Sequence, residues 1–170
     1  NQFFGDADIT AAMDTWYAGG TEVVFACGGG IYTSAVDAAK KVEGAKVIGV
    51  DVDQAGVIAN YAAGEGADAA TIEGYKALTV TSAMKGLYPA TFDTLTDVIV
   101  NGNWEKYSAK IDTLGLVSAD DPAANYVQIP MESTQWADGK FTQDDYKALV
   151  KAMFDGTLTV SNDITKAAKD

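Results

Sequence analysis

The sequence contains no histidine and only one cysteine, Cys27. Without histidine, it lacks the side chain that most often serves proteins as a general base and as a metal ligand. A single cysteine cannot form an internal disulfide, and it excludes a cluster of thiolate metal ligands. Because Cys27 lies at the end of an apolar run, we expect its thiol to be buried and inert. We predict no metal site, no cofactor and no catalytic residue.

Positive charge is also scarce. Lysine and arginine together number 12 against 24 acidic residues, which gives a net charge of −12. Nucleic-acid binding and docking on an anionic membrane both depend on cationic side chains, so the charge argues against either partner. No apolar run approaches the ~20 residues of a membrane-spanning helix, and no signal peptide is visible. An acidic surface is compatible with a location outside the cytoplasm.

The most informative stretch runs from Glu22 to Gln54. It contains an apolar run (Val23 to Cys27), three glycines (Gly28 to Gly30), a segment with helical spacing, and a second apolar run (Val47 to Val50) followed by Asp51. Two apolar runs too short for helices, joined by a helical segment, predict parallel strands with a right-handed crossover. Ligands of such sheets bind beyond the carboxyl ends of the strands. We therefore predict a small-molecule pocket at the glycines and Asp51.

The chemistry of this pocket favours a sugar over a phosphate. Gly30 is followed by Ile31 and Tyr32, so the G-x-G-x-x-G pattern is absent, and no P-loop pattern occurs. A glycine-rich turn can present N–H groups to an anion, or it can simply be a tight turn with positive φ. Asp51 would repel a phosphate at this turn, whereas a carboxylate pairs well with vicinal hydroxyls. Asp51 could instead cap the segment that follows it.

The remaining pattern alternates helices and strands and predicts an α/β fold. Asp6 is well placed as the N-cap of the first helix and Gly19-Gly20 as its end, and the crossover helix should turn Val36, Ala39 and Val42 inward. Residues 54–70 predict a short helix plus a mobile loop. The predicted helices cover residues 8–17, 31–41, 87–100 and 144–154, and the further strands cover residues 78–84, 110–116 and 126–129.

Four segments together carry a family resemblance. GGGIYTSA (28–35), KVIGVDVDQ (46–54), TVTSAMKGL (79–87) and LVKAMFDGTLTVSND (149–163) occur in this order. The sequence in this respect resembles the basic membrane protein family, the nucleoside-binding surface lipoproteins of ABC transporters. The resemblance implies a type I periplasmic-binding-protein fold with flavodoxin-like or Rossmann-like parallel-sheet lobes. It runs over nearly the whole chain and matches the C-terminal half of family members, which implies a partial chain. The start at Asn1 rather than methionine fits the removal of a preceding segment.

The resemblance also implies ligand contacts at matching positions. Asp51, the first acid of the DVDQ motif, matches the family aspartate that hydrogen-bonds the ribose hydroxyls. Lys85, in TSAMK, matches a lysine that also reaches the sugar. Gly28 and Gly29 match the paired glycines at the pocket wall.

Some candidate residues have a structural alternative. Gly30 and Tyr32 complete the predicted binding set, but many family members carry small residues followed by an aromatic or asparagine here. Tyr32 could be a core aromatic instead. Lys85 could be a solvated lysine at a strand end, since lysine is usually exposed. Asp53 is better explained as a surface or capping acid than as a ligand contact.

Three functions remain open. The first is the solute-binding component of an ABC importer, binding a nucleoside, with purine nucleosides favoured. The second is an enzyme of flavodoxin-like or Rossmann-like fold that acts on a nucleotide, and the third is a ligand-sensing regulatory domain of the same binding-protein fold. The enzyme hypothesis lacks a histidine, a paired-carboxylate motif and an activated nucleophile. We therefore predict a protein that is not an enzyme, an extracytoplasmic surface lipoprotein whose anchor is not in this chain.

The resemblance finally implies a division into lobes. Residues 1–76 and 131–170 should form the second lobe, and residues 77–130 should be a portion of the first lobe, entered through the strand at 78–84. A portion of a lobe would expose apolar patches and open sheet edges. We expect the missing N-terminal half or a second copy of the chain to cover them. The other predicted partners are a nucleoside or related small molecule and the permease of the transporter.

Overall fold

The computed structural model describes residues 2–161 and 163, and it contains a four-stranded sheet with the strand order β1-β2-β3-β4. The first three strands, β1 (Val23–Phe25), β2 (Lys46–Asp51) and β3 (Thr79–Lys85), are parallel neighbours. The short strand β4 (Val127–Gln128) runs antiparallel to the end of β3. The predicted α/β class with a mostly parallel sheet is confirmed, and it is compatible with a Rossmann-like or flavodoxin-like fold.

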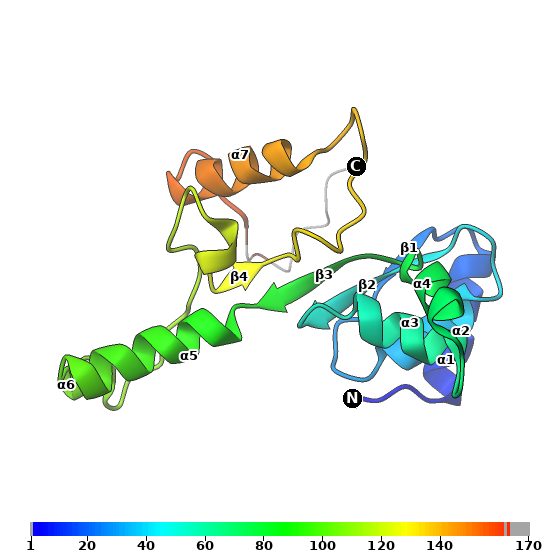
Figure 1. Ribbon diagram of the computed structural model, residues 1–170, viewed down its shortest axis with the longest axis horizontal. Coiled ribbons are helices and arrows are strands. Elements are labelled where there is room, and N and C mark those ends of the chain that lie inside the picture. Colours follow the sequence, from blue (N-terminus) through cyan, green and yellow to red (C-terminus); the bar gives the residue numbers. More distant parts are fainter. Residues whose placement is uncertain (1, 162, 164–170) are drawn as a thin grey trace.

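Four helices, α1 (Ala7–Ala18), α2 (Tyr32–Ala39), α3 (Ala55–Ala63) and α4 (Ala69–Lys76), accompany the first three strands (Figure 1). Asp6 caps α1 as predicted, because its carboxylate accepts a hydrogen bond from the Ile9 backbone N–H at 2.8 Å. Helix α2 is the predicted crossover between β1 and β2, and Val36 and Ala39 are buried on it. Val42 lies beyond the end of α2 and is 37% exposed, so its predicted inward orientation is wrong.

The buried core lies between these helices and the first two strands. Val36, Val47 and Ile58 are fully buried and come from α2, β2 and α3. The second half of the chain differs sharply: from residue 86 to residue 149, all of which the structure describes, Pro122 is the only apolar side chain that is buried. The apolar residues of this half therefore lack a core of their own.

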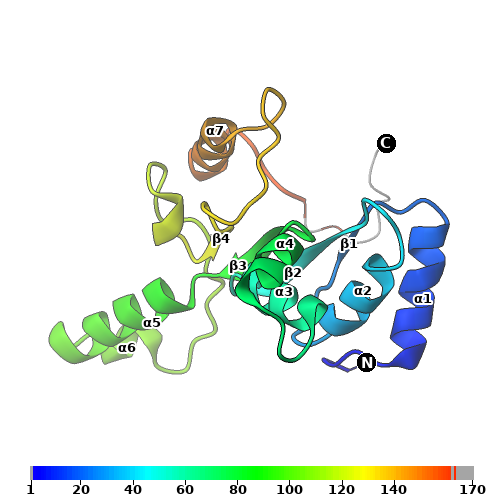
Figure 2. The same ribbon diagram turned by 45° about the vertical axis from the view of Figure 1, so that its right-hand side comes forward.

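An arm projects from the end of β3, away from α1 to α4 (Figures 1 and 2). We use this name for residues 87–107, which form α5 (Leu87–Leu95), the π-helical turn η1 (Thr96–Val100) and α6 (Trp104–Tyr107). The helix predicted over residues 87–100 corresponds to α5 and η1. Helix α7 (Gln143–Phe154), also predicted, packs Tyr146 against Trp136, and the short 3-10 helix η2 (Pro122–Ala124) precedes β4.

One predicted strand is wrong, and one helix was not predicted. The strand predicted over residues 110–116 is irregular chain, and Ile111 in it is fully exposed. A β-type sequence forms a strand only where a neighbour accepts its backbone hydrogen bonds, and this stretch pairs with none of the described strands. The short helix and the loop predicted over residues 54–70 correspond to α3 and to residues 64–68. Helix α4, which begins at Ala69, was not predicted; Asp68 caps it by accepting a hydrogen bond from the Thr71 N–H.

The predicted boundary between the two lobes falls just before β3. The predicted lobes would separate residues 78–84 from the first two strands. In the structure β3 pairs with β2 from Thr79 to Met84, and only Met84 and Lys85 pair with β4. Most of β3 therefore belongs to the same sheet as β1 and β2. The division of the chain into two lobes stays a prediction.

Candidate functional site

The glycine turn follows β1 and packs against the N-terminal segment of the chain. Gly29 adopts a φ of 48°, and the Gly30 N–H donates a hydrogen bond to the Phe3 carbonyl oxygen at 2.6 Å. A Cβ on Gly29 or Gly30 would lie 3.3 or 3.2 Å from the same carbonyl oxygen. The positive φ and the close approach of Phe3 thus explain two of the three glycines. The Gly30 N–H is already paired within the chain.

The other two principal candidates meet at the ends of neighbouring strands. Asp51 is the last residue of β2 and Lys85 is the last residue of β3, and their parallel pairing sets Asp51 beside Met84. Lys85 Nζ lies 2.6 Å from Asp51 Oδ1, and the two side chains are 67% and 36% exposed. Asp51 Oδ1 itself is shielded from water and makes no other hydrogen bond. The sheet therefore brings a carboxylate and an ammonium group together at its carboxyl edge.

The backbone at Asp51 is strained. Its φ is 70°, and the Val52 N–H donates to the Val50 carbonyl oxygen at 2.8 Å, which closes a γ-turn around Asp51. A γ-turn with positive φ is the rare, strained form, and backbone strain of this kind collects at ligand sites and other functional sites. Aspartate tolerates this region better than most residues. The turn presents the carboxylate at the sheet edge.

The charge environment of Lys85 includes Cys27. The pKa of Lys85 is raised, first by its hydrogen bond to Asp51 and then by the attraction of the Asp51 charge, with a smaller coulombic contribution from Cys27. Cys27 is exposed, so the predicted buried thiol is wrong. The reason is that β1 is an edge strand and Cys27 lies just past its end, where the apolar run leaves the sheet.

The buried Gln54 connects the turns that carry the candidate site to strand β3. No role was predicted for it from the sequence. Its side chain is 7% exposed, its Oε1 accepts a hydrogen bond from the Val50 N–H at 2.9 Å, and its backbone N–H donates to Ser82 Oγ at 3.0 Å. A longer contact of 3.5 Å joins its Nε2 to the Gly29 carbonyl oxygen. Gln54 therefore ties the turns after β1 and β2 to β3. The one sequence signal for this contact was the polar residue Ser82 inside the strand predicted over residues 78–84.

Gly49 makes room for this arrangement. A Cβ at this position would lie 2.7 Å from Ser82 Oγ, 2.8 Å from Gln54 Cβ and 2.9 Å from Gln54 Oε1. Contacts below 3.0 Å force neighbouring atoms to move. The glycine in the middle of β2 is thus required by the buried glutamine and serine above it.

Two predicted or alternative residues have local structural roles. The Tyr32 ring packs against the core and lies edge-on to Tyr61 at 5.9 Å, which matches the alternative of a core aromatic. Asp53 is exposed and its Oδ1 accepts a hydrogen bond from the Ala55 N–H at 3.1 Å, which fits its interpretation as a surface acid.

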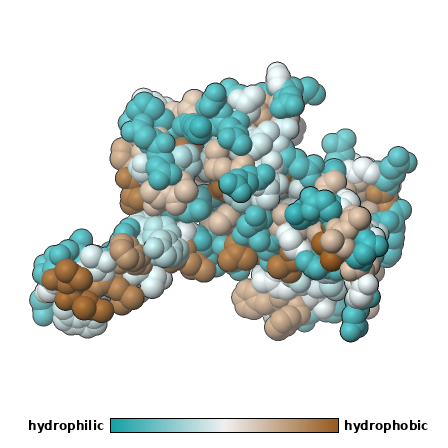
Figure 3. All heavy atoms as spheres, viewed as in Figure 1, coloured by the Kyte–Doolittle hydropathy of each residue, from teal (hydrophilic) through white to brown (hydrophobic). Residues whose placement is uncertain are grey.

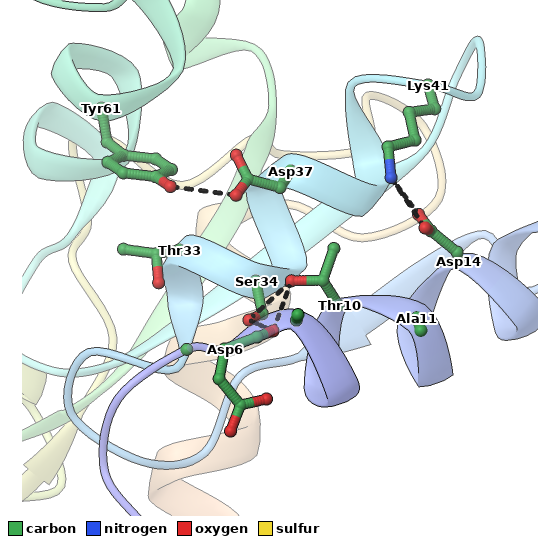
Figure 4. Close-up of a pocket in the computed structure, with 11 residues that line it drawn as sticks. Asp6, Thr10, Ala11, Asp14, Thr33, Ser34, Asp37, Lys41 and Tyr61 are labelled. Atoms are coloured by element: carbon green, nitrogen blue, oxygen red, sulfur yellow. Dashed lines mark hydrogen bonds and ion pairs between the residues drawn. The ribbon is translucent and has the colours of Figure 1, made fainter.

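A hollow of about 460 Å³ lies between α1, α2 and Tyr61 of α3 (Figure 4). Six of the polar side chains that line it pair with one another. The pairs are Lys41 with Asp14 at 2.7 Å, Tyr61 with Asp37 at 3.0 Å, and Thr10 with Ser34 at 2.9 Å. We therefore interpret these pairs as contacts that hold the helices together, and we assign the hollow no ligand.

No protein-family model matches the sequence, and no curated protein matches it. Within the described residues, no helix combines the length and the apolar character needed to cross a bilayer.

Proposed function

We propose that this chain is part of the solute-binding component of an ABC importer and that it binds a nucleoside, with purine nucleosides favoured. The observation that carries the proposal is the Asp51–Lys85 ion pair at the carboxyl ends of two adjacent parallel strands, with Asp51 held in a strained turn. Ligands of open α/β sheets bind at this edge. The type I periplasmic-binding-protein fold and the surface-lipoprotein location are parts of the same proposal.

The pair suits a neutral ligand with vicinal hydroxyls. A carboxylate can accept hydrogen bonds from two neighbouring hydroxyl groups, and an ammonium group can donate to a ring or hydroxyl oxygen of the same sugar. Lys85 occupies Asp51 Oδ1 at 2.6 Å, so a sugar hydroxyl would displace or share this contact. A phosphate would instead face the Asp51 charge on a chain of net charge −12. This contrast supports a nucleoside over a nucleotide.

The exposure of the pair supports a site with two walls. Small-molecule pockets bury about 70–90% of a ligand's surface, but the Lys85 and Asp51 side chains are 67% and 36% exposed. We propose that a second lobe, supplied from outside residues 1–170, closes over the ligand as in hinged binding proteins. The role is binding rather than catalysis, because the sequence offers no histidine to act as a base.

The test is calorimetric titration of the complete protein that contains this chain. Adenosine, guanosine and inosine should bind, while the corresponding free bases should bind much more weakly because they lack the hydroxyls that Asp51 recognises. The matching nucleoside 5′-monophosphates should also bind more weakly. Equal affinity for bases and nucleosides would contradict the proposal, and a preference for the monophosphates would favour a nucleotide-dependent enzyme.

A further inference from the structure

Buried polar side chains are few in this protein, and two of them contact each other beneath the candidate site. Hydrophilic side chains lie over much of the surface (Figure 3). The buried polar or charged residues among those described are Ser34, Gln54, Thr79, Ser82 and Asn125. Gln54 and Ser82 are 7% and 0% exposed, and the Gln54 backbone N–H donates to Ser82 Oγ. Burying a polar group costs free energy unless it is hydrogen-bonded, so the partners of this pair explain its presence.

Gln54 replaces a strand partner that the Val50 N–H lacks. Ile48, two residues earlier in β2, faces β1, because its carbonyl oxygen accepts a hydrogen bond from the Ala26 N–H at 3.1 Å. Alternate residues of a strand direct their backbone groups to the same neighbour, so the Val50 N–H points towards the same strand. The Ala26 carbonyl oxygen, however, accepts from the Gly28 N–H at 2.9 Å in the turn that leaves β1. Gln54 Oε1 takes its place and accepts from the Val50 N–H at 2.9 Å.

The same contact holds the turn that carries Asp51. Val50 is fixed at both of its backbone groups: its N–H donates to Gln54 Oε1, and its carbonyl oxygen accepts from the Val52 N–H at 2.8 Å. The γ-turn between Val50 and Val52 gives Asp51 its φ of 70°. A strained conformation of this kind persists only where the surrounding contacts impose it. Gln54 is the side chain that imposes it here.

We propose that Gln54 is a positioning residue for the Asp51 carboxylate. It acts through the backbone of Val50: without its Oε1, the turn relaxes to an unstrained φ, and the carboxylate leaves the direction in which it lies 2.6 Å from Lys85 Nζ. The consequence for a ligand rests on the proposed nucleoside function. The consequence for the ion pair of Asp51 and Lys85 does not.

A double-mutant cycle on inosine binding, in the complete protein that contains this chain, tests the proposal. Gln54→Met keeps the length of the side chain but removes the amide that accepts from the Val50 N–H. It should weaken inosine binding by roughly 10-fold or more, because it misdirects a charged hydrogen-bond acceptor. A positioning residue acts only through the group it positions, so Asp51→Ala/Gln54→Met should bind inosine no more weakly than Asp51→Ala alone. Unchanged affinity in Gln54→Met, or losses that multiply in the double variant, would overturn the proposal.

Two further variants separate positioning from loss of stability. Ile58→Ala removes a fully buried side chain of α3 and should leave inosine affinity unchanged. An equal loss of affinity in Ile58→Ala would show that Gln54→Met acts through stability, and it would overturn the proposal. If Gln54→Met does not fold, Ser82→Ala carries the same cycle, because it removes the acceptor of the Gln54 N–H. It should weaken inosine binding in the same direction and have no effect in the Asp51→Ala background; any other result would overturn the proposal.

The ion pair supplies a readout without the ligand. Acetic anhydride reacts with neutral lysine, so an ammonium group held by a carboxylate is labelled slowly. Lys85 with Asp51 at 2.6 Å and Lys41 with Asp14 at 2.7 Å are ion pairs of similar exposure, and Lys41 serves as the reference. In Gln54→Met, labelling of Lys85 relative to Lys41, measured by mass spectrometry, should rise roughly 1.5- to 5-fold, the range that an exposed ion pair allows. An unchanged ratio would overturn the proposal. If the ratio rises but the unmodified protein does not bind inosine, the positioning role stands and the proposed function falls.

Discussion

The substitution Gly49→Ala tests whether the buried contacts of Gln54 stabilise the candidate site, because it adds a single atom, the Cβ, next to them. This position faces the buried pair of Gln54 and Ser82, and the new methyl group would meet three of their atoms at 2.7–2.9 Å. Both neighbours are nearly or fully buried, at 7% and 0% exposed, so neither can swing into solvent. The substitution should therefore push Gln54 away from Val50 and from Ser82.

Two costs and one gain set the magnitude. Overpacking a buried site costs about 1–3 kcal/mol. Displacing Gln54 would leave the Val50 N–H and Ser82 Oγ without partners, which costs about 1–3 kcal/mol for a buried group. Replacing a strand glycine by alanine returns about 0.5–1 kcal/mol of backbone entropy. We expect Gly49→Ala to lower the free energy of unfolding by about 2–4 kcal/mol.

Gly74→Ala is the matched control, because Gly74 lies inside α4 and a Cβ there would meet nothing within 4 Å. It should raise the free energy of unfolding by about 0.5–1 kcal/mol through helix propensity. Urea unfolding followed by circular dichroism measures both variants on the same chain. A Gly49→Ala variant that is as stable as the unmodified protein would show that the added Cβ does not displace Gln54. Equal changes in the free energy of unfolding for the two glycine variants would show the same.

Two further predictions concern the core and the arm. Ile58→Ala removes a fully buried side chain and should lower the free energy of unfolding by about 2–5 kcal/mol, measured by urea unfolding. Val57→Ala, at a neighbouring position that is 47% exposed, should change this free energy far less. Equal effects of the two substitutions would contradict the described core. The pKa of Asp97 is lowered from 3.8 by hydrogen bonds from Lys106, then from Asn103 and further donors. The stabilisation from this carboxylate should be complete above its unfolded pKa of 3.8 and be lost as pH falls through its lowered folded pKa. Asp97→Asn should therefore destabilise the protein at pH 6 more than at pH 3, and a pH-independent difference in urea midpoints would rule this out.

The main elements of the first half could be predicted because local patterns determine them. Short apolar runs, the Asp6 cap and the glycine pair after α1 each act within a few residues, and the structure contains the corresponding strands and helix. The sequence pattern placed Asp51 at the carboxyl end of a parallel strand, whereas a role for Lys85 at the same ligand was implied only by the family resemblance. Their ion pair needed the further fact that β2 and β3 are neighbours.

The remaining features depend on contacts between segments that are distant in the sequence. The packing of Gln54 against Ser82 depends on the register between β2 and β3, which shifts by a bulge between Val47 and Ile48. Cys27 is exposed because β1 is the edge of the sheet, a property of strand order that no local pattern contains. The irregular chain at 110–116 likewise reflects the lack of a neighbouring strand among the described residues rather than its own composition.

The most direct test of the proposed function compares two neighbouring acids in the complete protein. Asp51→Ala removes the carboxylate that pairs with Lys85, whereas Asp53→Ala removes an exposed carboxylate that accepts a hydrogen bond from the Ala55 N–H. Loss of a charged hydrogen-bond partner costs about 1.5–3 kcal/mol, so calorimetric titration with inosine should show roughly 10- to 150-fold weaker binding for Asp51→Ala. Asp53→Ala should bind inosine like the unmodified protein. Unchanged affinity in Asp51→Ala, or an equal loss in both variants, would contradict the assignment of Asp51 to the ligand.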